Sequence, residues 1–136
     1  MQPLTSDYNL LIRHLIEKGG VDCSMLSPEK IKEFEETAEK FVHNDMLLEA
    51  IKVYSMTSNK SKLIGLGNTC LKMNKVEFAF EAFKNAKDRQ GLVDVGGAFL
   101  GEGRLRNAYI AFKLSEDEEM IKFFETNWKE GMDYYV

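Results

Sequence analysis

Apolar residues recur along this chain at helical spacing, and their pattern repeats every 29 residues. In each repeat a small residue is followed four positions later by an aromatic one, as in Ala50 and Tyr54, Ala79 and Phe83, and Ala108 and Phe112. A period of this length is typical of stacked supersecondary units, each of which buries its apolar face against its neighbours. The pattern therefore predicts a repeat architecture and not a core built around one site.

Short polar turns interrupt the apolar spacing and predict an all-α chain. Ser27-Pro28-Glu29 has the composition of a helix start, because serine caps the helix, proline fits the first turn and glutamate complements the helix dipole. We expect this helix to end near His43, before a turn at Asn44-Asp45. Further helices are expected near residues 46–57, 60–73, 76–87, 89–101, 105–114 and 116–129. A capping box at residues 115–118 is expected to open the last of these helices.

The N-terminal segment is predicted to form one more helix. Asp7 is its candidate N-cap, and Gly19-Gly20 is expected to end it. Its apolar side chains fall on more than one side of the helix, so it either caps the array or forms a weak homodimer contact. These apolar residues are Tyr8, Leu10, Leu11, Leu15 and Ile16.

The first helix of each pair carries three positions that recur with the same period. Two are large or core-like: Phe34, Leu63, Leu92 and Ile121, and Phe41, Cys70, Phe99 and Trp128. The third is Ala38, Gly67, Gly96 and Glu125. Glycine inside a helix costs about 1 kcal/mol relative to alanine, and close approach of the partner helix is the simplest reason to keep it. Glu125 breaks the small pattern, as expected for a capping helix whose outer side meets water.

These positions resemble the tetratricopeptide repeat family, whose first helix carries a large apolar residue, Leu-Gly and an aromatic, and whose second carries Ala, an aromatic and Ala. One unit has Leu63, Leu66-Gly67, Cys70, Ala79, Phe83 and Ala86. The next has Leu92, Val95-Gly96, Phe99, Ala108, Phe112 and Ser115, and a more divergent unit has Phe34, Ala38, Phe41, Ala50, Tyr54 and Thr57. The resemblance covers about residues 31–128.

The resemblance implies a right-handed α–α superhelix of antiparallel helix pairs within a single domain, residues 1–136. Repeats are expected near residues 31–58, 60–88 and 89–115, with an N-terminal helix and a capping helix at 116–129. The chain departs from the family in its period, 29 residues instead of about 34, and in lacking the exit proline. Tight repeats of this kind are also similar to the helical-hairpin solenoids of vesicle-coat and intraflagellar-transport subunits.

By the same resemblance, the protein is expected to be an interaction scaffold or adaptor that presents a concave helical surface to a peptide or helix. The first-helix positions that would build this surface include Glu35, Glu39 and Lys122, together with the candidate partner-binding residues Ile64, Asn68, Leu71, Val93, Gly97 and Leu100. Glu35 and Glu39 stand where a carboxylate clamp needs Lys and Asn, which argues against that mode. The four aliphatic candidates are either core residues, which we favour, or anchors for an amphipathic helix.

The charge is unevenly distributed along the chain. Residues 50–115 carry a net charge of +6, whereas residues 1–49 and 116–136 carry −5 each. Lys60, Lys62 and Arg89, near the starts of first helices, are expected to line one edge of the array and to favour an acidic or amphipathic-helical protein partner. The overall charge of −4 argues against nucleic acid binding.

The sequence offers no constellation for catalysis, a cofactor or a metal, so we expect the protein not to be an enzyme. His14 and His43 share no helical face with ligating residues, and Cys23 and Cys70 are expected to be reduced thiols. Gly65-Leu66-Gly67 and Gly96-Gly97 lack the strand and the Lys-Ser/Thr ending of a phosphate loop. No signal peptide and no apolar run of about 20 residues is present, which predicts a cytoplasmic protein. The alternative to an adaptor is a structural subunit of a coat-like or self-stacking assembly.

Overall fold

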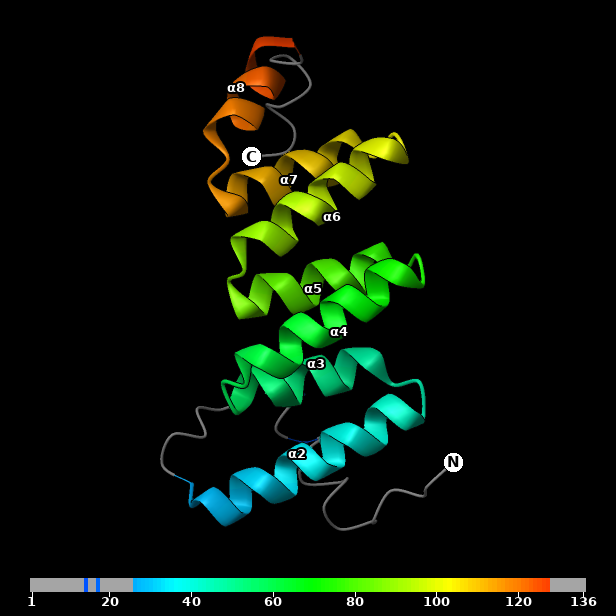
Figure 1. Cartoon of the computed structure of the whole chain (residues 1–136), viewed down its shortest axis with the longest axis vertical. Helices are drawn as coiled ribbons and strands as arrows, with labels where there is room; N and C mark the ends of the chain where they lie inside the picture. Colours follow the sequence, from blue (N-terminus) through cyan, green and yellow to red (C-terminus); the bar gives the residue numbers. More distant parts are fainter. Residues whose placement is uncertain (1–13, 15–16, 18–25, 128–136) are drawn as a thin grey trace. The chain divides into compact units, whose positions relative to one another are not determined.

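The computed structural model describes residues 14, 17 and 26–127 (Figure 1). Over residues 26–127 the chain forms seven α-helices and no strand, which confirms the all-α prediction. The helices up to α7 agree with the predicted ranges to within one residue at each end. They are α2 (Pro28–His43), α3 (Leu47–Met56), α4 (Lys60–Lys72), α5 (Val76–Ala86), α6 (Arg89–Gly101), α7 (Leu105–Ser115) and α8 (Glu118–Asn127).

Some predictions fall outside the described residues. These are the N-terminal helix with its Tyr8, Leu10, Leu11, Leu15 and Ile16 and its homodimer contact, the thiol of Cys23, and Trp128 at the end of the capping helix.

The chain divides into two compact units, Met1–Gly65 and Leu66–Val136, with the boundary inside α4. In the first unit α2 packs against α3 (Figure 1). In the second unit α6 contacts both α5 and α7, and α7 contacts α8. Each unit is therefore built from helices that are neighbours along the chain.

The turns between helices repeat one backbone geometry with the 29-residue period of the sequence. Turns after first helices place Asp45, Asn74 and Gly103 in the left-handed region, with φ of 59°, 59° and 74°. Turns after second helices place Ser58, Lys87 and Glu116 there, with φ of 56°, 54° and 61°. In each turn the following residue donates its backbone N–H to the carbonyl five residues earlier, from Met46 to Phe41 at 2.8 Å through Asp117 to Phe112 at 3.2 Å. This bond satisfies a carbonyl at the end of the preceding helix.

Side-chain caps begin four of the described helices, among them α4, where the Asn59 amide oxygen accepts a hydrogen bond from the Lys62 N–H at 3.1 Å. The Ser27 hydroxyl accepts a hydrogen bond from the Lys30 N–H at 3.3 Å, as predicted. The Asp88 carboxylate accepts one from the Gly91 N–H at 3.1 Å. The capping box predicted at Ser115 is wrong, because Ser115 still belongs to α7 and Glu116 is its left-handed C-cap. Asp117 caps α8 instead, accepting a hydrogen bond from the Met120 N–H at 3.2 Å.

The small positions of the first helices face aromatic rings of the second helices, which confirms the predicted close approach. A Cβ atom added to Gly67 would lie 2.6 Å from Cζ of Phe83, and one added to Gly96 would lie 2.8 Å from the Phe112 ring. A Cβ atom on Gly91, which the sequence analysis did not single out, would overlap the base of the Phe83 ring. The Phe83 ring therefore lies between the backbones of α4 and α6, and glycine is needed on both sides.

The second unit closes over a further aromatic cluster. Phe124 of α8 is fully buried, and its ring centroid lies 5.8 Å from that of Tyr109 and 5.9 Å from that of Phe112. Glu125 is exposed, as predicted, and accepts a hydrogen bond from the Tyr109 hydroxyl at 3.3 Å. A buried ring and a polar contact at the surface thus both join α8 to α7.

Candidate functional site

The predicted partner-binding residues form one face on each of two first helices. Ile64, Asn68 and Leu71 share a face of α4, and Val93, Gly97 and Leu100 share the equivalent face of α6, because positions i, i+4 and i+7 align along a helix. The four aliphatic side chains are half-buried, and Asn68 and Gly97 are exposed. None of the six belongs to the buried core. This corrects our preference for a core role of the aliphatic residues.

Gly97 differs from the neighbouring Gly96. A Cβ atom on Gly96 would collide with Phe112, whereas one on Gly97 would meet nothing within 4 Å. Packing inside the chain therefore explains Gly96 but not Gly97. The backbone of α6 is accessible at Gly97, between the half-buried side chains of Val93 and Leu100.

The structure brings the two helices together within the second unit. The Phe83 ring adjoins the backbone of Gly67 in α4 on one side and of Gly91 in α6 on the other. The same ring is thus flanked by two helix segments. One is the part of α4 that carries Asn68 and Leu71, and the other is α6, which carries Val93, Gly97 and Leu100. Ile64 belongs to the first unit.

The three cations predicted along the edge of the array are all exposed, but two are paired within the chain. Lys62 Nζ lies 3.0 Å from Glu39 Oε1, and Arg89 Nη2 lies 2.6 Å from Glu116 Oε2. Exposed ion pairs of this kind contribute only about 0–1 kcal/mol to stability, so an incoming carboxylate can compete for these cations. Lys60 is the remaining exposed cation of the three.

Glu35 and Glu39, one helical turn apart in α2, hold the first unit together. Glu35 Oε2 accepts hydrogen bonds from the Asn59 amide and, at 3.1 Å, from the Thr57 hydroxyl. Glu39 Oε1 accepts one from the buried Tyr54 hydroxyl at 2.7 Å. These carboxylates were expected on the concave face. The structure uses them to attach α2 to α3 and to the turn before α4.

The hydrogen bond from Tyr54 is the main cause that lowers the pKa of Glu39, and Lys62 adds to it. A carboxylate with a lowered folded-state pKa stabilises the protein above its unfolded pKa of about 4.3, and this stability is lost as the pH falls through the folded pKa. We therefore expect Tyr54→Phe to destabilise the protein at pH 7, and the difference from the wild type to shrink below about pH 4.

Urea unfolding between pH 7 and pH 3 measures this effect. Lys62→Met should act in the same direction as Tyr54→Phe, whereas Lys60→Met, two residues away in the same helix, should leave the pH profile unchanged. A constant difference between Tyr54→Phe and the wild type at all pH values would contradict the role of Glu39.

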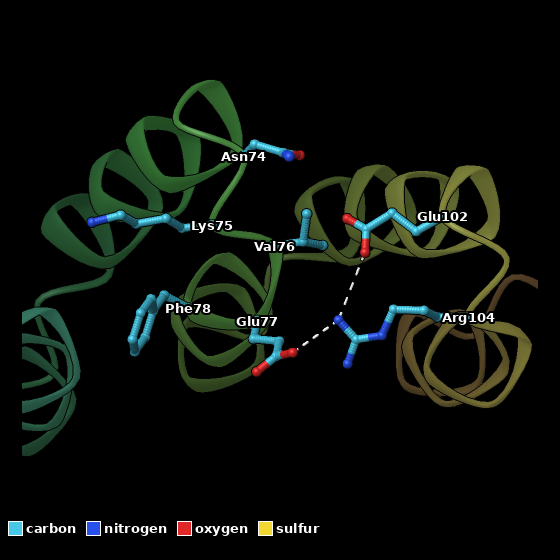
Figure 2. A pocket seen from close by; sticks show the side chains of 7 residues that line it. All are labelled: Asn74, Lys75, Val76, Glu77, Phe78, Glu102 and Arg104. Carbon is cyan, nitrogen blue, oxygen red and sulfur yellow. Dashed lines mark ion pairs between the residues drawn. The ribbon is translucent and has the colours of Figure 1, made fainter.

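A hollow of about 220 Å³ lies in the second unit, where the turn before α5 faces the turn before α7. Figure 2 shows Glu77 and Glu102 pointing toward the Arg104 guanidinium. Arg104 Nη1 lies 2.8 Å from Glu77 Oε1 and 3.7 Å from Glu102 Oε2, and its Cζ lies 4.9 Å from the centroid of the Phe99 ring. Arg104 was not singled out from the sequence, and none of the six candidate face residues lines this hollow. It is lined by Asn74, Lys75, Val76, Glu77, Phe78, Glu102 and Arg104.

Within the described residues, no group of three or more His, Cys, Asp or Glu side chains is arranged to hold a metal ion. No helix in the described part of the chain has both the length and the apolar character that crossing a bilayer requires. Cys70 is a buried cysteine, and His43 is exposed at the end of α2.

Comparison of the chain with protein-family models, with curated proteins and with solved structures gives no significant match. The function proposed below therefore rests on the residues and geometry of this chain.

Proposed function

We propose that this protein is a helical-repeat adaptor that binds a peptide or helix of a partner protein along the exposed faces of α4 and α6. The observation that carries the proposal is the accessible, partly apolar face formed by Val93, Gly97 and Leu100. Packing within the chain leaves Val93 and Leu100 half-buried and leaves the backbone at Gly97 open. A partner helix that covers this face would bury two aliphatic side chains and approach the α6 backbone closely.

The proposal includes the architecture. We infer that the helix pairs stack as a right-handed superhelix similar to tetratricopeptide repeats. The recurrence of left-handed turn residues at 45, 74 and 103, and at 58, 87 and 116, supports this inference. Identical turns with identical spacing favour a constant rotation between successive pairs, which is the condition for a solenoid.

The expected energetics are those of a small interaction surface. Most of the affinity would come from a few apolar anchors, Val93 and Leu100 among them. Lys60 and the exposed cations Lys62 and Arg89 would mainly increase the association rate with an acidic segment. The mechanism is rigid display of a surface without chemical catalysis.

An affinity pull-down with mass spectrometry tests the proposal. We expect Val93→Asp, and Leu100→Asp separately, to lose specific partners that the wild type retains, because a carboxylate in the contact would be desolvated. Asp94→Asn, which changes the exposed neighbour of Val93, is the matched control and should retain them.

Circular dichroism and thermal unfolding of each variant show whether the fold is retained. Retention of every specific partner by folded Val93→Asp and Leu100→Asp would refute the proposed face.

A further inference from the structure

Some exposed residues are apolar where the chain carries polar residues 29 positions before and after them. Met73 and Phe78, which flank the turn between α4 and α5, are 54% and 36% exposed. At the positions 29 residues before and after Met73 the chain carries Asn44 and Glu102, and around Phe78 it carries Glu49 and Asn107. The turn between α4 and α5 is therefore apolar where the corresponding turns are polar.

The same turn is basic. Residues 72–75, Lys-Met-Asn-Lys, carry a charge of +2, whereas residues 43–46 carry −1 with His43 neutral, and residues 101–104 carry no net charge. The hollow of Figure 2 is lined by residues of this turn and by Arg104. Since Glu102 lies 3.7 Å from Arg104, beyond hydrogen-bond distance, the guanidinium can accept another carboxylate as partner.

A complementary surface lies at the turn between α7 and α8. Leu114 is 47% exposed, whereas the equivalent positions carry the polar Asn85 and the buried Met56. Residues 116–119, Glu-Asp-Glu-Glu, carry −4, whereas residues 58–61 and 87–90 carry +1 each. Glu116 is held by Arg89 and Asp117 caps α8, so Glu118 and Glu119 are the exposed carboxylates of this turn that have neither role.

We propose that the basic, apolar turn of one copy of this chain binds the acidic turn of a second copy, with Leu114 against Met73 and Phe78. The charges of the two turns are opposite. Each turn also has exposed apolar side chains beside its charges, Met73 and Phe78 at the basic turn and Leu114 at the acidic turn. Both surfaces remain exposed within one chain, so they do not cover each other there. The contact joins two different surfaces, and repeating it generates either a ring or an open chain of copies. This self-association is separate from the first-helix face of the proposed adaptor function.

Sedimentation of the wild-type chain from micromolar to millimolar concentration tests the proposal. We expect species larger than the monomer that grow with concentration and diminish at high salt, because salt screens exposed charges. Met73→Asn with Phe78→Glu, which installs residues found at the equivalent positions, should weaken the association about tenfold or more. Val93→Asp is the control and should associate like the wild type.

Reversing the charges distinguishes this contact from any other. Lys72→Glu with Lys75→Glu should give a monomer, and so should Glu118→Lys with Glu119→Lys. A mixture of these two variants should associate again, because every contact between unlike copies restores opposite charges. A wild-type chain that stays monomeric at all concentrations would overturn the proposal. Association that persists in both charge-reversed variants would also overturn it.

Discussion

Gly91→Ala is expected to destabilise the protein by about 1–3 kcal/mol, because the new Cβ atom would overlap the base of the Phe83 ring. The ring cannot move away freely. Phe83 is fully buried, and its far edge already fits against the backbone of Gly67 in α4. Helix propensity alone favours alanine over glycine by about 1 kcal/mol, so a net loss of stability would show that packing outweighs propensity.

Chemical denaturation measures this effect, and Gly97→Ala is the matched control in the same helix. Nothing lies within 4 Å of a Cβ atom on Gly97, so that variant should be more stable than the wild type by about 0.5–1 kcal/mol. Combining Gly91→Ala with Phe83→Leu should cost less than the sum of the two single changes, because both act on one contact. Equal stabilisation by Gly91→Ala and Gly97→Ala would refute the tight fit around Phe83.

Phe124→Ala is expected to lower the free energy of unfolding by about 3–5 kcal/mol. Phe124 has no exposed surface, and its ring packs against those of Tyr109 and Phe112. Truncation would leave a cavity between α7 and α8 and remove most of the apolar contact that holds the last helix.

The neighbouring Phe123 provides a control of the same residue type. Its side chain is 44% exposed, so Phe123→Ala should cost less than about 1 kcal/mol. Urea unfolding of both variants, monitored by circular dichroism, measures the difference. Similar losses for the two substitutions would contradict the placement of Phe124 at the centre of this cluster.

Much of the local structure could be predicted from the sequence. The apolar spacing placed α2 to α7 to within a residue, because helical periodicity and turn residues are local properties. The recurrence of Gly67 and Gly96 at the 29-residue spacing indicated close helix approach, because glycine costs about 1 kcal/mol relative to alanine inside a helix. Gly91 gave no such signal. The equivalent residues are Lys62 and Met120, so glycine does not recur at this position of the repeat. Its position three residues after Asp88, in the first turn of α6, also allows glycine at little cost.

The chemistry of the surface was harder to predict. The sequence placed Glu35 and Glu39 on a binding face, but the fold brings Thr57, Asn59 and Tyr54 to them from 15 to 24 residues away. The start of α8 was misplaced because Ser115 and Asp117 are both good capping residues. The left-handed turn at Glu116, which ends α7, decides between them.

The sequence by itself determined the helices, the repeating turns and the small and aromatic positions, since each depends on neighbours within one or two helical turns. Only the tertiary structure decided which aromatic ring packs against which glycine, which carboxylates accept hydrogen bonds within the chain, and which aliphatic side chains stay accessible. These outcomes depend on the distance between helices. Gly96 faces the Phe112 ring and cannot carry a Cβ atom, whereas Gly97, the next residue of the same helix, lies on the exposed face and has room for one.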